Sequence, residues 1–425
     1  MGLYKMRSYT RNSSLTDMMN CPTIFLHDIS TLPGYEKVGF IIGIDRYDRV
    51  LSIARPQDLV LLKEQPDQDY LAWLEEVGLG KRNVLVLDDK DGTLPERVLH
   101  PDVKNAVTTW HDSQQARAII SPYYCGSLEE RASTYLGIPM YASSKATELF
   151  NSKIHFKNLC NQIGVKTIEG TIVEIGRDNE KLRDALYQYG VSSGRVIIRG
   201  EYGASGSSVH IAEKPEDAET VIAKSIDGDR YLVEPFLKVS SSPSSLWFVT
   251  KNGKCAHMRT SDQILDHGIV HEGNNVPPQY DEHVINDIAF EIVHAMSNQG
   301  FIGALGIDFI VTNQGIFPTE CNPRFTGASY PWELLNRIEQ QVHIPYARAK
   351  NIHVSRDMTF AKLRMLWKDV LYDGKRFDGV VLPFNVGPLR DGKISVLGLS
   401  SSASQLDTMF SFMDYKPTEV YQIVA

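Results

Sequence analysis

The sequence predicts a multidomain protein of mixed α/β and α+β class. Over residues 1–140, short apolar runs alternate with helix-like segments, as is typical of an open α/β domain. Over residues 141–345, runs rich in β-branched and aromatic residues are broken by Gly/Ser loops, which favours a mostly antiparallel α+β domain. Residues 346–425 form a small C-terminal α+β region. A chain of 425 residues with 42% hydrophobic residues is long enough for two or three such domains.

The N-terminal region is expected to form an open, partly parallel sheet flanked by helices. Candidate strands cover residues 37–44, 83–88 and 117–121, and candidate helices cover residues 69–77 and 127–136. The sequence contains no Gly-x-x-x-x-Gly-Lys-Ser/Thr loop. Any nucleotide chemistry of this chain is therefore not that of a P-loop ATPase.

The central and C-terminal regions alternate short strands with two longer helices. The helices are predicted at residues 147–163 and 281–299. The strands are predicted at residues 195–199, 231–234, 246–250, 379–384 and 393–399.

Composition and charge argue against several classes of partner. The net charge is −8 and the chain has no long Lys/Arg run, so neither nucleic acid nor an anionic membrane is expected as a partner. No stretch reaches the roughly 18 apolar residues of a membrane span, and the first residues lack an apolar signal core, which predicts a cytoplasmic protein. The five scattered cysteines suggest buried thiols, with neither a disulfide framework nor a zinc site. A homodimer is the commonest assembly of soluble enzymes, although the sequence does not specify one.

A hairpin with two acidic residues is predicted late in the central region. Alternating apolar residues flank the loop at residues 313–315, whose final glycine can take a positive φ without steric cost. If the turn centres on Gln314, Asp308 lies opposite Glu320, and strand alternation places Asn322 on the same face. The opposite face then carries apolar side chains toward a core, namely those of Ile307, Phe309 and Cys321.

The two facing acids indicate a metal site. Like charges placed directly opposite on a sheet are destabilising unless another charge compensates them. A hard cation with oxygen ligands is the simplest compensation, and Mg²⁺ is usually held by one or two carboxylates together with substrate phosphates. Asp308, Glu320 and Asn322 are therefore candidate ligands of Mg²⁺ or Mn²⁺. The alternative is two solvated acids on a surface hairpin.

A Gly/Ser loop at residues 199–209 is a candidate anion site. It begins with Arg199, and its small residues would let backbone N–H groups approach phosphate oxygens. The candidate binding residues in the loop are Gly203, Ser205, Gly206 and Ser207. The alternative is a flexible connection between two strands.

The run 231–237 is a candidate base-recognition segment. Pro235 cannot donate to a sheet ladder, so the strand should end there or become an edge. Backbone groups near Pro235 and Leu237 would then be free to contact a planar base, and Glu234 could accept from an exocyclic amine. The alternative is an ordinary strand end with a solvated acid.

Three cations complete the candidate set. Lys153 lies in the helix-like segment, Arg259 follows the strand-like run 254–258, and Arg324 comes two residues after Asn322. Each could be a surface charge. Arg324 is the exception, because its closeness to the two acids suits either an ion pair or a clamp on a transferred phosphate.

Taken in order, these residues resemble the ATP-grasp superfamily over about residues 145–330. The strongest part of the resemblance is the spacing of Asp308, Glu320 and Asn322-Pro-Arg324 on one hairpin. It implies ATP held between two α+β subdomains, with Mg²⁺ on the two acids and the asparagine. Lys153 and Arg199 would hold the α- and β-phosphates, the Gly/Ser loop would cover the β- and γ-phosphates, and residues 234–237 would contact adenine. Arg199 stands where the superfamily commonly has lysine, and Ser207-Ser208 replaces a common Lys-Gly pair.

The resemblance implies an ADP-forming carboxylate ligase. A substrate carboxylate would form an acyl phosphate, with Arg324 and Arg259 stabilising the transferred group. The overall layout is similar to a subgroup typified by the pheganomycin peptide ligase and the butirosin-pathway ligase that loads glutamate onto an acyl carrier protein. An amino acid, with glutamate favoured, and either a carrier-protein thiol or a peptide amine are the implied partners. A kinase and a non-catalytic ATP-binding protein are the alternatives on the same scaffold.

Overall fold

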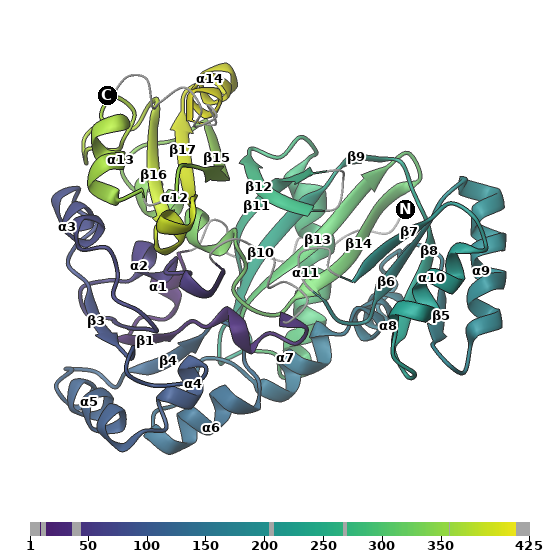
Figure 1. Ribbon diagram of the computed structural model, residues 1–425, viewed down its shortest axis with the longest axis horizontal. Helices are drawn as coiled ribbons and strands as arrows, with labels where there is room; N and C mark the ends of the chain where they lie inside the picture. Colours follow the sequence, from purple (N-terminus) through teal and green to yellow (C-terminus); the bar gives the residue numbers. More distant parts are fainter. Residues whose placement is uncertain are drawn as a thin grey trace.

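A computed structural model describes residues 9, 14–35, 44–203, 208–266, 270–356 and 358–413. The described residues form three sheets, which follow one another across the molecule from the N-terminal unit through the central sheet to a smaller sheet (Figure 1). The expected mixture of a parallel sheet with antiparallel sheets is confirmed.

The N-terminal sheet is parallel throughout. Its strand order is β3-β2-β1-β4, formed by Asn83–Val86, Leu59–Leu62, Thr23–Leu26 and Ile119–Pro122. The main helices around it are α3 (Gln68–Glu76), α5 (Pro101–Asp112) and α6 (Ser127–Leu136), and shorter ones are α1 (Leu15–Met18), α2 (Val50–Ile53) and α4 (Leu94–Arg97). Of the strand predicted at 37–44, residues 37–43 lie outside the described residues, and the prediction is wrong at Ile44, which begins a 3₁₀ helix.

A four-stranded antiparallel sheet forms the smaller part of the central region. Its order is β5-β8-β6-β7, formed by Thr171–Glu174, Arg230–Pro235, Val196–Gly200 and Val209–Ala212. Helices α9 (Asn179–Ser193) and α10 (Asp217–Lys224) contribute Leu182, Leu186 and Val221 to the apolar core beneath it. Strand β8 ends at Pro235, as predicted from the missing N–H donor.

The largest sheet has nine strands and crosses the predicted boundary near residue 346. Its order is β14-β13-β10-β11-β12-β15-β17-β16, with β9 paired to β13. The strands are β9 (Val239–Ser241), β10 (Pro243–Val249), β11 (Cys255–Asp266), β12 (Val270–Val276), β13 (Gly303–Thr312), β14 (Gly315–Asn322), β15 (Tyr346–His353), β16 (Val380–Asn385) and β17 (Lys393–Ser400). Because β12 pairs with β15, the C-terminal region continues the central sheet.

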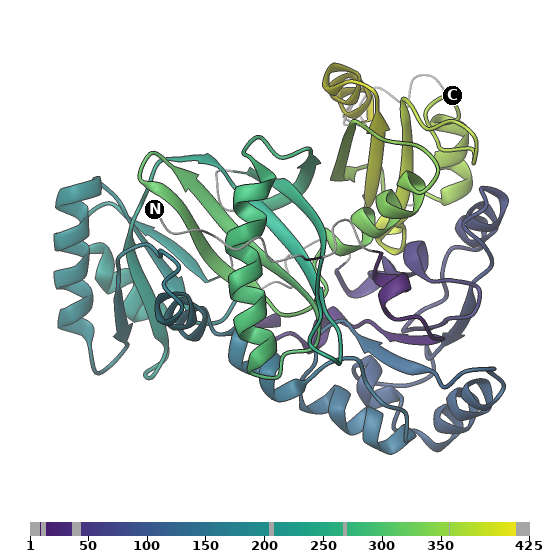
Figure 2. The ribbon, with the colours of Figure 1, turned by 180° about the vertical axis from the view of Figure 1, so that it is seen from behind.

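Helices cover the large sheet and connect it to the N-terminal unit. Figure 2 shows α11 (Glu282–Asn298) crossing one face of the central strands, where it packs against β10 and β11. Helix α12 (Ser329–Glu339) packs against α2, and α13 (Phe360–Leu366) packs against α3. Helix α14 (Ala403–Met413) packs on β15 and β17. One apolar core therefore contains residues of the N-terminal unit, α12 and the C-terminal strands.

The helix predicted at residues 147–163 is divided in two. Helix α7 (Ser144–Asn151) ends before Ser152, and α8 (Lys153–Gln162) begins after it. The Ser152 hydroxyl accepts a hydrogen bond from the His155 N–H, which caps α8. This break places Lys153 in the first turn of α8, whereas the sequence predicted Lys153 near the middle of a single helix.

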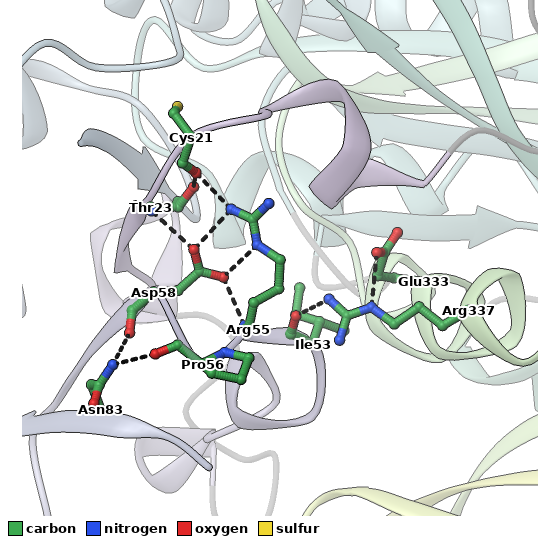
Figure 3. Close-up of polar contacts among 9 residues, drawn as sticks. All are labelled: Cys21, Thr23, Ile53, Arg55, Pro56, Asp58, Asn83, Glu333 and Arg337. Carbon is green, nitrogen blue, oxygen red and sulfur yellow. Dashed lines mark hydrogen bonds and ion pairs between the residues drawn. The ribbon is translucent and has the colours of Figure 1, made fainter. Parts of the chain in front are cut away.

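Polar contacts fix the position of the N-terminal unit against α12. Asp58 is fully buried, and its carboxylate accepts from the Thr23 N–H at 3.0 Å and from the Arg55 side chain (Figure 3). Nearby, Arg337 of α12 donates to the Ile53 carbonyl and also contacts Glu333. The helix that follows the acidic hairpin is thereby tied to α2 of the N-terminal unit.

All five cysteines are free thiols, as expected. Four are buried, whereas Cys21 is half-buried, so the expectation of burial is wrong for that residue. Among the described residues, no helix is long and apolar enough to cross a membrane.

Candidate active site

The acidic hairpin has the predicted register at its acids. Asp308 of β13 pairs with Glu320 of β14, and Asn322 donates from Nδ2 to Asp308 Oδ2 at 2.9 Å. The opposite face carries Ile307, Phe309 and Cys321 into an apolar core.

The acids have the predicted register, but the turn of the hairpin differs from the one expected. The turn contains two residues, Asn313 and Gln314, because Gly315 is already paired with Thr312. A bulge between Asp308 and Phe309 adds one unpaired residue, Thr319, on the opposite strand. The extra residue restores the alignment of the acids that a three-residue turn would have given.

The two acids have opposite pKa shifts. Burial and the facing Glu320 raise the pKa of Asp308 from 3.8 to about 7. Burial acts to raise the pKa of Glu320, but Lys153, Arg199 and Arg324 together outweigh it and the net shift is downward. Lys153 Nζ lies 3.0 Å from Glu320 Oε2, and 30% of the Glu320 side chain remains exposed. The two facing carboxylates therefore share one directly contacting lysine.

A second buried carboxylate, Glu234, lies between two cations. Lys157 Nζ contacts Glu234 Oε1 at 2.6 Å, and Arg199 Nη2 contacts Glu234 Oε2 at 2.6 Å. Burial acts to raise the pKa of Glu234, but these cations lower it below its usual value. Both oxygens already have a cation, and Glu234 also lines the cleft described below, so its expected contact with an exocyclic amine stays a prediction.

The bulge on the hairpin connects the two carboxylate sites. Arg199 Nη1 donates to the carbonyl oxygen of Thr319 at 2.8 Å, while the Thr319 hydroxyl donates to the Asp308 carbonyl at 3.1 Å. A regular ladder would leave no unpaired residue at this point of β14. The small sheet and the acidic hairpin are therefore joined through Arg199.

A cleft of about 830 Å³ lies between these two parts of the central region. Its wall includes Lys153, Arg199, Asp308 and Glu320. Pro235 and Leu237 line it as well, as does Gly203, whose carbonyl oxygen accepts a 3.4 Å hydrogen bond from Lys153. The predicted loop residues Ser205, Gly206 and Ser207 lie outside the described residues.

The two predicted catalytic arginines lie in different surroundings. The Arg324 charge lowers the pKa of both Asp308 and Glu320, and its Nε is buried without a hydrogen-bond partner among the described residues. Arg259 lies within β11, so its expected position after the strand is wrong. Its guanidinium is paired with Glu339 and Asn336 of α12, although its Nε also lacks a partner among the described residues. Neither arginine lines the cleft.

Models of two known domain families match separate segments of the chain. The model of the ATP-grasp domain matches residues 179–328, and the model of the pre-ATP-grasp domain matches residues 47–138. The chain contains an ATP-grasp domain.

Known ATP-grasp proteins are similar to the chain over most of its length. The [butirosin acyl-carrier protein]–L-glutamate ligase of Niallia circulans is 24% identical over 324 residues, covering 73% of this chain and 70% of the relative. N5-carboxyaminoimidazole synthetase of Staphylococcus aureus, solved with ADP, aligns with a TM-score of 0.55 at 12% identity, covering 95% of this chain and 99% of that one. Biotin carboxylase of Campylobacter jejuni aligns with a TM-score of 0.58 at 14% identity, covering 92% and 90%.

Two residues that contact the charged groups of this cleft were not predicted from the sequence. Lys157 follows Lys153 by one helical turn, so both lie on one face of α8, and that spacing was the available signal. Thr319 gave no signal, because a bulge depends on how both strands pair.

The donor set of the hairpin fits a hard cation. Two carboxylates face each other, and Asn322 directs its amide nitrogen to Asp308, which leaves its amide oxygen available. Within the described part of the chain, no group of three or more His, Cys, Asp or Glu side chains is placed to hold a metal. Two carboxylates and an amide agree with a Mg²⁺ that takes its remaining ligands from phosphates and water.

Proposed function

We propose that this ATP-grasp ligase activates the carboxylate of an amino acid as an acyl phosphate and transfers the acyl group to a thiol or an amine. The observation that carries the proposal is that Asp308 and Glu320 face each other beside Lys153, in a cleft that Arg199 also lines. Acids that face each other beside fixed cations suit a triphosphate with its metal, because phosphoryl transfer needs positioning and charge neutralisation.

The first step would be attack of a donor carboxylate oxygen on the γ-phosphorus of ATP. The bond from that phosphorus to the β–γ bridging oxygen breaks, and ADP leaves. Asp308, Glu320 and Asn322 would hold Mg²⁺, which when bound neutralises phosphate charge. Lys153 would then exchange its contact with Glu320 for a phosphate oxygen. Arg324, whose Nε has no partner among the described residues, would hold the transferred phosphoryl group.

In the second step, a nucleophile would attack the acyl carbon and expel inorganic phosphate. Water would compete with that nucleophile, so the intermediate must be shielded. The roles of Gly203, Ser205, Gly206 and Ser207 in covering the phosphates, and of Pro235 and Leu237 in contacting adenine, stay predictions. Arg259 is the weakest member of the predicted set, because Glu339 already neutralises it.

We favour an acyl-carrier-protein thiol as the acceptor and glutamate as the donor. The similarity to the Niallia circulans ligase supports this choice. A peptide ligase would use the same ATP cleft with an amine acceptor.

A hydroxamate trap tests the activation step. The chain is incubated with ATP, Mg²⁺, hydroxylamine and single amino acids, and hydroxamate and ADP are measured. Hydroxamate formed in proportion to ADP supports the proposal. A stable phosphorylated product would indicate a kinase, and nucleotide binding without turnover would indicate a sensor. Replacing hydroxylamine with a carrier protein or with amines then separates the two acceptors.

A further inference from the structure

A second, smaller cavity lies at the carboxyl edge of the parallel sheet. His27 follows β1, Lys63 follows β2 and Tyr123 follows β4, and all three line it. Strand β1 lies between β2 and β4. The chain passes from β1 to β2 and β3 on one side and then returns to β4 on the other side of β1. In open α/β sheets, ligands bind in the crevice at such a reversal.

This cavity adjoins the loop that follows the acidic hairpin. The Phe325 N–H donates to the Tyr123 carbonyl at 3.1 Å, and the ring centroids of Phe325 and His27 are 4.5 Å apart. A Cβ added to Gly327 would lie 3.4 Å from Nη1 of Arg49, which also lines the cavity. Asp308, Glu320 and Arg324 do not line it. A group bound here would lie beside the loop that follows the hairpin and outside the set of candidate metal ligands.

Arg49 is the cation of this cavity that has no carboxylate partner among the described residues. Lys63 is 2.8 Å from Asp28, and Arg46 is 3.0 Å from Asp391. Arg390 is 4.0 Å from Glu64.

Aromatic rings hold the Arg49 guanidinium in place. It stacks 4.2 Å from the Tyr47 ring centroid and 6.0 Å from that of Tyr330. Its Nε is buried and has no hydrogen-bond partner in the described structure. A guanidinium held by its faces keeps its N–H edges for a carboxylate.

Two more buried polar atoms of the lining lack partners within the described residues. His27 Nε2 is one, while Nδ1 of the same ring lies 2.9 Å from the Tyr330 hydroxyl. Burial lowers the pKa of His27 to about 3, so the ring stays neutral and can donate one hydrogen bond. Asp48 is 4% exposed, and its Oδ2 is the other atom; as an acceptor it suits the ammonium group of an amino acid and not a carboxylate. Unpartnered buried polar atoms are uncommon in folded proteins, and several in one cavity point to a polar ligand.

The free volume of the cavity limits the size of that ligand. It is about 50 Å³, against about 830 Å³ for the cleft of the ATP-grasp domain. One water needs roughly 10–15 Å³ by this kind of measure. The smaller cavity therefore takes a group of carboxylate size and not a nucleotide.

We propose that Arg49 binds the second carboxylate of the donor, the one that is not activated. The enzyme thereby selects a dicarboxylic amino acid. This inference rests on the proposed ligase function. Arg49 acts as a specificity-determining residue, and His27 adds a hydrogen bond to the same carboxylate. The other carboxylate of the donor then faces the hairpin.

The test compares Arg49→Gln with wild type on two donors of nearly the same shape, L-glutamate and L-glutamine. Hydroxamate formation gives kcat/KM for each donor, and calorimetry gives the Kd of a non-hydrolysable ATP analogue. The wild type should prefer glutamate, and Arg49→Gln should lower kcat/KM for glutamate by about tenfold to a hundredfold, as expected for losing a charge-assisted hydrogen bond. The Kd of the ATP analogue for Arg49→Gln should stay within about twofold of the wild-type value. The control Arg364→Gln changes an exposed arginine on α13, so its kcat/KM and its Kd should both stay within about twofold of wild type.

The outcomes separate the two proposals. A wild type that uses glutamine as well as glutamate, or an Arg49→Gln variant that keeps the wild-type preference, would overturn the role of Arg49 and leave the ligase proposal standing. A wild type that forms no hydroxamate with any amino acid would overturn both. Thermal unfolding of Arg49→Gln within about 2 °C of wild type excludes misfolding as the cause of a lost preference.

Discussion

Two carboxylates of one cleft differ in how their charge is neutralised. Glu234 is 1% exposed and receives a cation on each oxygen, from Lys157 and Arg199. Asp308 instead faces another acid, and its pKa rises to about 7. A carboxylate whose charge is already balanced supports the framework of a site. A carboxylate that is left unbalanced is suited to a ligand that carries the missing positive charge.

The largest expected effect is on turnover at the unbalanced pair. Glu320→Gln keeps the side-chain volume but removes the charge that would hold a metal, so ADP formation should fall by on the order of a thousandfold. The chain should still fold, because the residue is partly exposed. Glu219→Gln, the same change on an exposed residue paired with Arg183, is the matched control. Near-normal ADP formation by Glu320→Gln would remove the hairpin from the catalytic site.

The same chemical change at the two carboxylates should have opposite effects on stability. Glu234→Gln leaves Lys157 and Arg199 buried without their charge partner, which costs about 3–5 kcal/mol in the free energy of unfolding. Asp308→Asn relieves repulsion from Glu320 and should leave that free energy unchanged or raise it. Denaturant titration of both variants without nucleotide measures the difference. Equal destabilisation of the two would show that Asp308 is a structural residue like Glu234.

The pH dependence of stability should reveal the unbalanced acid. The folded chain retains the proton of Asp308 up to about pH 7, whereas the unfolded chain releases it near 3.8. The stability that this group contributes is therefore present at low pH and is lost as the pH rises toward 7. The melting temperature of Asp308→Asn relative to wild type should increase from pH 5 to pH 7 and then level off. A difference that does not vary with pH would contradict the raised pKa.

The smallest effect is expected at an exposed ion pair, which sets the scale for the buried ones. Arg364 and Glu76 lie 2.9 Å apart, with 36% and 61% of their side chains exposed. Arg364→Gln should change the free energy of unfolding by less than about 0.5 kcal/mol, because solvent and salt screen such pairs. A loss of more than about 2 kcal/mol in the free energy of unfolding would equal that expected for a buried polar group. It would show that exposure does not distinguish weak ion pairs from strong ones.

Local patterns in the sequence predicted the hairpin well. Alternation of apolar residues sets which side chains share a face, so Asp308, Glu320 and Asn322 could be placed together without a structure. Apolar runs also predicted the fold class, although in the N-terminal sheet they located β3 and β4 and missed β1 and β2.

Features that depend on distant residues could not be predicted. Glu234 is paired with Arg199 and Lys157, which are 35 and 77 positions away, so its isolated position in a strand suggested a free acid. The break at Ser152 depends on a cap that competes with an otherwise helical pattern. The pairing of β12 with β15 joins regions that composition had separated near residue 346.

The most direct measurement is the affinity of a non-hydrolysable ATP analogue at low and high Mg²⁺, for wild type and Glu320→Gln, by calorimetry. The wild type should bind the analogue at least about tenfold more tightly at high Mg²⁺, and the variant should lose that dependence while keeping the Mg²⁺-independent part. A variant with the full Mg²⁺ dependence of the wild type would contradict the assignment of Asp308 and Glu320 as the metal-binding pair.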